Sequence, residues 1–396
     1  MKCRACNNEK LFDAIDLGKI PIAAGFAKED LLKPELYETK MVVCSSCGLG
    51  QTSIDLDESS LFSYYNFRTS LSKSFLKHSK AYCDEVVKKY NITKDDWVLE
   101  LASNDGYMLK YFKEKGIGIL GVDPAENLAF YSAINGVPTI SQFFGSTLAQ
   151  EILKEKGYPK LIIANNVMAH VPNIQDFMNG IAILCSDETV VSVENPTIMN
   201  ILEKDHFDTI FHEHYSYLSC NSVSRLANRF SLELFDVEFL TTHGGSNRYW
   251  LSKNKERSSI VNETIKYESD SGLMNNNAWE IAYSRIKFNV EKFHNKIKSL
   301  NSSDAVICGY TASAKSTVLL NFAQIKRGDI KAIADDAVEK QGHYVLGPSI
   351  PITSMEDMLK INPTDIIVFS WNIYDEIKNK VINAGHKDVN VWVWNG

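Results

Sequence analysis

The stretch WVLELASNDGYMLKYFKEKGIGILGVD, residues 97–123, decides the fold. It begins with a short apolar strand over 97–101, passes through a turn of small residues over 102–106, and becomes helical from Tyr107. A second apolar strand over 119–122 ends at Asp123. A strand, a helix and a second strand in this order predict the opening of a doubly wound α/β sheet, in which ligands bind at the carboxyl ends of the strands.

The turn after the first strand reads ELASNDG and lacks the GxGxxG pattern that cradles a dinucleotide pyrophosphate. The carboxylate of Glu100 and the single glycine Gly106 suit a cationic or neutral ligand, and Asp123 is placed to accept hydrogen bonds from ribose hydroxyls. This combination favours S-adenosylmethionine (SAM) over a nicotinamide cofactor or no nucleotide. The predicted cofactor site comprises Glu100, Ala102, Ser103, Asn104, Gly106, Asp123, Pro124, Phe143, Phe144, Asn165, Asn166 and His170.

For two groups of these residues, a purely structural role is the alternative to cofactor binding. Phe143 and Phe144 follow the third strand region, where they either stack beside adenine or pack in the core. His170 follows the strand LIIAN, where it either lines the methionine end of the cofactor or holds a loop carbonyl. The residues alone leave both choices open.

Composition excludes several classes of protein. The chain of 396 residues has a formal net charge of −7, which weighs against a nucleic-acid binder held by phosphate contacts. No apolar run reaches the ~18 residues of a membrane span, and the N-terminus MKCRACNNEK lacks the apolar core of a signal peptide. We therefore expect a cytoplasmic protein with no nucleic-acid or membrane partner.

Four of the eight cysteines form two CxxC pairs, CRAC at 3–6 and CSSC at 44–47. Two such pairs supply a closed tetrahedral shell of four thiolates, which is typical of structural zinc. A redox pair or a chance arrangement is the alternative. We predict that Cys3, Cys6, Cys44 and Cys47 bind Zn²⁺ in a small N-terminal module, with no chemical role for the metal.

The last third of the chain repeats the α/β pattern. DAVICGYTASAKSTVLL, residues 304–320, predicts a strand, a tight turn and a helix, and IKAIADD predicts a strand that ends in Asp335 and Asp336. Small residues before a helix can bind phosphate through backbone N–H groups, and Lys315 adds positive charge there. Tight packing of helix on strand is the alternative. We expect Ser313, Lys315 and Asp335 to contact substrate.

The stretch TIFHEHYSYL, residues 209–218, has two histidines on either side of a glutamate. It could supply a catalytic base, a metal clamp or a well-bonded structural segment. On an extended strand His212 and His214 would point to one side and could share a metal, but no third ligand is evident.

In order and spacing, these segments resemble the SAM-dependent C-methyltransferases that act on nucleotide-linked 4-keto-6-deoxy sugars. The resemblance runs nearly end to end and is specific to the family rather than to one substrate. It is carried by the CxxC pairs, CGLGQ, SYYNFRTSLS, LELASNDGYML, GVDPAENLA, ANNVMAHVPN, FDTIFHEHYSYLS, THGGSNRYW, GYTASAKSTVLLNF, KQGHYVLGPSIPI and FSWN.

The resemblance implies two Rossmann-like doubly wound domains after the four-cysteine zinc module. The expected boundaries are 1–72 for the zinc module, 73–255 for the SAM domain, 256–300 for a helical connection and 301–396 for a domain that helps to hold the nucleotide sugar. The resemblance also implies that His214 is the general base, that Glu213 orients it or contacts the sugar, and that Tyr65 donates to the developing enolate. It adds His243, Gly244, Gly245, Ser246, Arg248, Trp371 and Asn372 to the substrate site.

Three positions depart from the family. Phe211 and Phe67 stand where tyrosine is usual, which removes two phenol donors, and Thr311 stands where glycine is common. The expected substrate carries dTDP, with GDP and CDP as alternatives, and is methylated at C-3 with S-adenosylhomocysteine as product. The expected oligomeric state is a monomer, with a homodimer as alternative. An O- or N-methyltransferase acting on a nucleotide sugar and a non-enzymatic nucleotide-sugar sensor are the competing functions.

Overall fold

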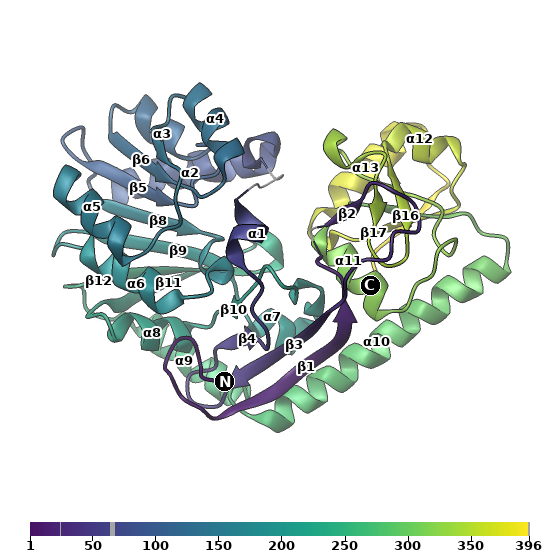
Figure 1. Ribbon diagram of the computed structural model, residues 1–396, viewed down its shortest axis with the longest axis horizontal. Helices are drawn as coiled ribbons and strands as arrows, with labels where there is room; N and C mark the ends of the chain where they lie inside the picture. The colour runs from purple at the N-terminus through teal and green to yellow at the C-terminus, as the bar shows by residue number, and fades with distance from the viewer. Residues whose placement is uncertain (24, 64–67, 395–396) are drawn as a thin grey trace.

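The computed structural model describes residues 1–23, 25–63 and 68–394, and it arranges them as two α/β lobes joined by a curved antiparallel sheet and a long helix (Figure 1). Tyr65 and Phe67 lie outside the described residues. None of the helices in these three segments is both long enough and apolar enough to cross a bilayer.

The first lobe is built on a seven-stranded sheet in the order β11-β12-β9-β8-β5-β6-β7. Its central strands are parallel, and β12 pairs antiparallel with both of its neighbours. The strands are β5 (Trp97–Leu101), β6 (Gly118–Val122), β7 (Thr139–Ile140), β8 (Leu161–Asn165), β9 (Val190–Pro196), β11 (Glu233–Leu240) and β12 (Ser246–Ser252).

Helices pack around this sheet and connect its strands. They are α2 (Lys73–Lys89), α3 (Leu109–Glu114), α4 (Glu126–Ile134), α5 (Ser146–Lys156), α6 (Ile174–Ile183), α7 (Met199–Lys204), α8 (Cys220–Asn228) and α9 (Ser259–Asp270). Short 3-10 turns are η1 (Thr69–Leu71), η2 (Met168–His170), η3 (Phe207–Thr209) and η4 (Thr242–Gly244). The strands β5 and β8 are buried almost throughout, as strands covered on both faces must be.

The second lobe has another seven-stranded sheet, in the order β18-β17-β13-β14-β16-β15-β2. Its strands are β13 (Ile307–Tyr310), β14 (Ile333–Ala334), β15 (Tyr344–Val345), β16 (Ile350–Thr353), β17 (Asp365–Val368) and β18 (Asn390–Trp392), with β2 (Phe26–Ala27) added from the N-terminal module. Its helices are α11 (Ala314–Phe322), α12 (Met355–Lys360) and α13 (Tyr374–Asn383), and its 3-10 turns are η5 (Val338–Lys340) and η6 (Trp371–Ile373).

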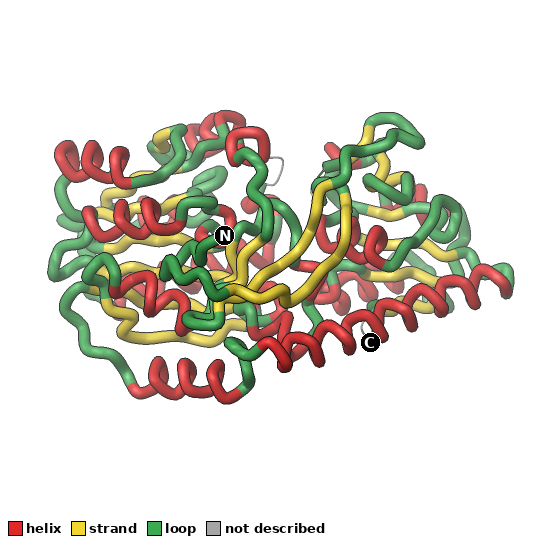
Figure 2. Tube along the Cα trace, turned by 60° about the horizontal axis from the view of Figure 1, so that its bottom comes forward, coloured by secondary structure: helices red, strands yellow, loops and turns green. Residues whose placement is uncertain are grey.

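The N-terminal module connects the lobes. Its sheet has the order β1-β3-β4-β10, formed by β1 (Leu11–Ile20), β3 (Tyr37–Cys44), β4 (Gly50–Thr52) and β10 (Ser216–Tyr217). The short helix α1 (Glu58–Phe62) follows β4, and the helix α10 (Asn276–Ser302) runs from one lobe to the other (Figure 2). The phenol of Tyr283 on α10 donates to the carbonyl of Asp16 on β1. The prediction of an α/β chain with two doubly wound parts after a four-cysteine module is confirmed.

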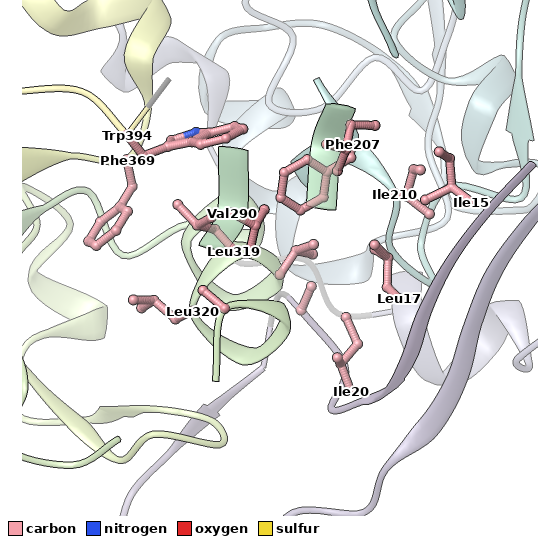
Figure 3. Packing of buried hydrophobic residues seen from close by; sticks show 14 of the residues in the cluster. Ile15, Leu17, Ile20, Phe207, Ile210, Val290, Leu319, Leu320, Phe369 and Trp394 are labelled. Carbon is pink, nitrogen blue, oxygen red and sulfur yellow. The ribbon is translucent and has the colours of Figure 1, made fainter. Parts of the chain in front are cut away.

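A hydrophobic cluster fills the space where the module, α10 and α11 meet (Figure 3). The ring of Phe207 lies 5.4 Å from the ring of Phe322 and 5.2 Å from the ring of Trp394, centroid to centroid. Phe207 is fully buried and lies just before the HEH segment in the chain. The labelled members of the cluster are Ile15, Leu17, Ile20, Phe207, Ile210, Val290, Leu319, Leu320, Phe369 and Trp394.

We predict that Phe207→Ala lowers the free energy of unfolding by ~3–5 kcal/mol, because it leaves a cavity where three parts of the chain meet. Urea denaturation followed by tryptophan fluorescence measures the change. The matched control is Phe239→Ala, at a ring that is 60% exposed, which should change the same free energy by less than ~0.5 kcal/mol. Equal effects of the two substitutions would contradict the assigned core.

Candidate active site

The turn after β5 is held by the carboxylate of Asp123 at the end of β6. One oxygen of Asp123 accepts from the backbone N–H of Asn104 at 2.8 Å, and the other accepts from that of Ala125 at 2.9 Å. The turn contains three left-handed residues, Ala102 (φ 57°), Asn104 (φ 51°) and Gly106 (φ 75°). A Cβ at residue 106 would lie 2.9 Å from Val137, so glycine is required there by both conformation and space.

The same edge of the sheet carries a group of buried acceptors. Oε2 of Glu100, Oδ1 of Asp105 and Oδ1 of Asn165 are buried and have no hydrogen-bond partner within the described segments. Burial raises the pKa of Glu100 well above its usual value, and the nearby Asp123 and Asp105 carboxylates raise it further. Unpaired buried acceptors are costly, and a ligand that carries ammonium and sulfonium groups would offset that cost. These residues therefore fit SAM.

The remaining predicted cofactor residues lie in the turn after β5 and in the loops that follow β6, β7 and β8. Phe144 packs edge-on against Phe177 at 5.5 Å, whereas Phe143 is 39% exposed. Asn166 is left-handed (φ 53°), and its backbone N–H donates to the carbonyl of Glu194 at 2.6 Å. Ser103 is fully buried, and Pro124 directly follows Asp123. The adenine contact predicted for the two phenylalanines stays a prediction.

His214 is held in the tautomer that a base requires. Its Nδ1 lies 2.9 Å from the carbonyl oxygen of Thr209. A carbonyl can only accept, so Nδ1 carries the hydrogen and Nε2 keeps its lone pair. Burial lowers the pKa of His214 well below its usual value, and the neighbouring His170 lowers it further. His214 is therefore neutral at neutral pH, with its hydrogen on Nδ1 and a lone pair on Nε2.

The neighbours of His214 are mostly aromatic. The ring of Phe211 is tilted by 31° from the plane of the imidazole at a centroid distance of 4.0 Å, and the ring of His170 lies 4.7 Å away. Nδ1 of His170 donates to the backbone carbonyl of Glu213 at 2.7 Å, and burial lowers the pKa of His170 to about 4. His170 thus donates to a loop carbonyl, and it lies in η2 shortly after Asn165 at the end of β8, the sheet edge predicted to bind the cofactor. Glu213 itself is only 5% exposed.

His212 has different partners from His214. Its Nε2 lies 2.9 Å from Oγ1 of Thr39 and 3.2 Å from the carbonyl of Glu38, both on β3. In the parts of the chain that the structure describes, the only group of three or more potential metal ligands is the cysteine cluster. His212 and His214 therefore make hydrogen bonds to different parts of the chain and do not share a metal site, which disfavours the metal-clamp interpretation of HEH.

Side chains from both lobes meet next to the HEH segment. We call His206, Asp208, His243, Lys315 and Trp371 the junction cluster. The indole N–H of Trp371 donates to Oδ2 of Asp208 at 3.1 Å, and the ring of Trp371 lies 4.1 Å from that of His206. Nζ of Lys315 lies 4.1 Å from the centroid of the Trp371 ring.

Burial governs the charges of the junction cluster. It lowers the pKa of His206 and of His243 to about 4, and Lys315 contributes to both shifts. It also lowers the pKa of Lys315 and raises that of Asp208. Lys315 further donates to Oδ1 of Asn372 at 3.3 Å. The cluster can therefore offer an ammonium and neutral imidazoles to an anionic or carbonyl-bearing ligand.

Gly244 and Gly245, which follow His243, allow the side chains of Trp371 and Asn200 to lie close to the backbone. A Cβ at Gly244 (φ 81°) would lie 2.0 Å from the ring of Trp371, and one at Gly245 (φ 128°) would lie 2.9 Å from Asn200. Ser246 then starts β12, and its hydroxyl donates to the carbonyl of Thr242 at 3.0 Å. His206 and Asp208 were not predicted from the sequence. Their position just before the HEH segment is the only signal that could have singled them out.

The four N-terminal cysteines are arranged as a tetrahedral metal site. Their sulfur atoms all lie within 4.8 Å of one another, with Cys3 and Cys47 at 3.5 Å and Cys6 and Cys44 at 3.7 Å. Zinc–sulfur bonds of about 2.3 Å in a tetrahedron place the sulfurs roughly 3.8 Å apart. The cluster therefore fits a structural Zn²⁺ with no coordination position left for substrate.

Comparison with known proteins extends over nearly the whole chain. Family models match residues 3–62 as a putative zinc binding domain, 75–237 as a methyltransferase domain and 241–392 as a C-methyltransferase C-terminal domain. The chain is 29% identical to the C-methyltransferase NovU of Streptomyces niveus over 385 residues, which is 95% of this chain and 91% of NovU. The chain is a SAM-dependent methyltransferase, and its residues 241–392 match the model of a C-methyltransferase C-terminal domain.

The solved structures that resemble this chain overlap about half of it. The magnesium protoporphyrin IX methyltransferase of Synechocystis with bound SAM has a TM-score of 0.39 and 12% identity, and the match covers 51% of this chain and 100% of that one. The PH0226 protein of Pyrococcus horikoshii has the same TM-score and identity, over 50% of this chain and 100% of that one.

Three predicted substrate residues of the methyltransferase are already engaged by protein groups. Arg248 is 3% exposed, and its guanidinium bonds Glu194 at 3.0 Å and Glu238 at 2.9 Å. Asp335 pairs with Lys340 at 3.0 Å. The Ser313 hydroxyl caps the first turn of α11 in a reciprocal pair with Ser316. These contacts favour structural roles for Arg248 and Asp335.

Thr311 occupies a left-handed conformation (φ 72°), which is unusual for a β-branched residue. Its Oγ1 donates to the carbonyl of Tyr310 at 2.6 Å and accepts from the backbone N–H of Ser370 at 2.9 Å. The missing glycine is thus replaced by a threonine whose hydroxyl joins two strand ends beside the junction cluster. The cost of the conformation is offset by these hydrogen bonds.

We predict that Cys44→Ser lowers the zinc content of the methyltransferase from one ion per chain to well below one, because the shell loses a thiolate. Metal analysis of the purified protein measures this content. Cys83→Ala is the matched control, since Cys83 is buried in the core of the first lobe, away from the cluster. One zinc per chain in Cys44→Ser, or the loss of zinc from Cys83→Ala, would contradict the assignment.

Proposed function

We propose that the methyltransferase transfers the methyl group of SAM to a ring carbon of a nucleotide-linked 4-keto-deoxy sugar, most simply C-3. The observation that carries the proposal is the state of His214, whose Nδ1–H is engaged by Thr209 while Nε2 keeps its lone pair. A neutral, oriented imidazole next to a cofactor edge is what removal of a proton from carbon requires. The similarity to a C-methyltransferase over nearly the whole chain supports carbon as the acceptor.

In the proposed reaction, Nε2 of His214 takes the proton from the carbon next to the ketone. The C–H electron pair then enters the enolate, and its negative charge moves onto the ketone oxygen. When bound, SAM would supply an electrophilic methyl group, and the electron pair of the broken S–CH₃ bond would stay on sulfur to give S-adenosylhomocysteine. The nucleophilic ring carbon takes that methyl, the ketone forms again, and His214 is left protonated until it releases its proton to solvent.

The chain offers two kinds of support for this step. Burial lowers the pKa of His214, whereas the carbonyl of Thr209 accepts from its Nδ1–H, which opposes that lowering and orients Nε2. Lys315 in the junction cluster can donate to an oxyanion or to a phosphate oxygen, and its position at the start of α11 suits an anionic ligand. We propose Glu213 as the residue that orients His214 or contacts the sugar, and Tyr65 as an enolate donor.

The junction cluster supports a substrate with a negative and a polar part. Trp371 offers an aromatic face, and Lys315 and His243 offer polar groups beside it. We propose that the first lobe, with the cofactor turn, binds SAM, and that residues 301–396 help to hold the nucleotide, with dTDP before GDP or CDP. We also propose a cytoplasmic monomer. An O- or N-methyltransferase on the same substrate class is the competing function, with His214 deprotonating a hydroxyl or ammonium.

We predict that His214→Asn lowers turnover by ~10²–10⁴-fold while leaving SAM affinity within about twofold. Asparagine keeps a donor near the position of Nδ1, so the bond to Thr209 can persist, but it lacks the basic Nε2. His386→Asn, in the loop after α13, is the matched control and should leave turnover unchanged. Steady-state kinetics with a dTDP-4-keto-6-deoxyhexose and calorimetric SAM titration measure both quantities.

Exchange of hydrogen separates carbon methylation from the competing function. With S-adenosylhomocysteine in place of SAM, the wild-type enzyme in D₂O should incorporate deuterium at the carbon next to the ketone, and His214→Asn should not. Methyl transfer without such exchange by the wild-type enzyme would favour the O- or N-methyltransferase. Wild-type turnover in His214→Asn would remove His214 as the base.

A further inference from the structure

His212 fastens the catalytic loop, residues 209–217, to the zinc-binding module. Its Nε2 lies 2.9 Å from Oγ1 of Thr39 and 3.2 Å from the carbonyl of Glu38, and its ring meets the ring of Tyr37 edge-on at 5.6 Å. His212 is only 3% exposed. All three partners lie on β3, which runs to the zinc ligand Cys44.

The hydrogen positions at this contact follow from its partners. The carbonyl of Glu38 can only accept, so Nε2 of His212 carries the hydrogen. The hydroxyl of Thr39 donates to the carbonyl of Tyr37 at 3.1 Å, so a lone pair of Thr39 accepts from His212. Burial lowers the pKa of His212, so the imidazole stays neutral and this arrangement persists at neutral pH.

Further along the loop, the chain is attached to the module at two more points. The phenol of Tyr215 donates to the carbonyl of Leu56 at 2.7 Å, and the backbone N–H of Thr52 donates to the carbonyl of Tyr215 at 3.2 Å. Ser216 and Tyr217 then form β10, which pairs antiparallel with β4. His214 therefore lies between two attachments to the module, one at His212 and one from Tyr215 onward.

We propose that His212 is a positioning residue, which holds the catalytic loop on β3 so that Nε2 of His214 faces the substrate. This inference rests on the proposed role of His214 as the base. The side chain of His212 contacts the module, and it acts on the reaction only through the backbone that it shares with His214. A displacement of a catalytic group by about 1 Å can lower the rate by ~10²-fold, so loss of this attachment should reduce kcat rather than binding.

The test compares two substitutions of similar size in the full-length, zinc-loaded enzyme. His212→Phe keeps a packed ring but has no donor, whereas His212→Gln places an amide N–H₂ near the position of Nε2. We expect kcat to fall by ~10²-fold in His212→Phe and to return to within ~5-fold of wild type in His212→Gln. The dissociation constant for SAM and the zinc content of one per chain should stay unchanged in both variants.

Thr39→Val provides a second, milder variant. It removes the acceptor at 2.9 Å but leaves the carbonyl of Glu38, so we expect a smaller fall in kcat than in His212→Phe. Combined with His212→Phe it should add little, because residues that act through one contact are not additive. Additive losses in the double variant would contradict a shared role.

A readout without turnover separates this inference from the proposed function. In ¹⁵N spectra of histidine-labelled enzyme, His214 should show the Nδ1–H tautomer in the wild type and in His212→Gln, and a mixture of tautomers in His212→Phe. If the spectra change in this way but His214→Asn is fully active, the positioning role stands and the base assignment fails. Wild-type kcat and an unchanged tautomer in His212→Phe would overturn the inference, as would an inactive His212→Gln or a loss explained by missing zinc or SAM.

Discussion

The pairing of β4 with β10 is the constraint on which the active site depends. It joins a segment that starts beside two zinc-binding cysteines to the segment that directly follows HEH. A small module has little core of its own, so a metal that cross-links its two ends stabilises the sheet to which the catalytic loop is attached. Phe207 fixes the other end of the loop in the hydrophobic cluster between the lobes (Figure 3).

Burial produces an active site in which most titratable groups are neutral. His170, His206 and His243 all have a pKa of about 4, and that of His214 is also lowered. The edge that carries Glu100 follows the same rule, because burial and then the neighbouring carboxylates of Asp123 and Asp105 raise the pKa of Glu100, and a bound cation would favour its charged form. Under the proposed function, the acidic edge favours a cationic methyl donor, and His214 is the neutral base beside it. In the proposed reaction, this separation allows a neutral base to take a proton from a ring carbon that lies next to the sulfonium of SAM.

The parts predicted from sequence were those with strong local patterns. The apolar strand 97–101, its turn and Asp123 indicated the SAM lobe, and the two CxxC pairs indicated the metal site. The junction cluster was only partly foreseen, because His206 and Asp208 come together with Trp371 through contacts between distant segments. The same limit applies to Arg248, whose sequence context gives no sign of its partners Glu194 and Glu238 on neighbouring strands.

Two strands that pair with a sheet in another part of the chain were also not predictable from the sequence. β2 belongs to the N-terminal segment but pairs with β15 of the second lobe, and β10 belongs to the first lobe but pairs with β4. Each of these strands has two residues, too few for a periodic pattern. Within the stretch 209–218 the structure places β10, and α8 starts shortly after it at Cys220.

A crystal structure of the enzyme with S-adenosylhomocysteine and a dTDP-4-keto-6-deoxyhexose tests the central claim most directly. The account predicts that Nε2 of His214 lies within ~3.5 Å of the ring carbon next to the ketone and that the sulfur of the cofactor product faces the same carbon. A sugar bound with a hydroxyl or amine toward the sulfur, and with His214 turned away from the ring, would contradict it.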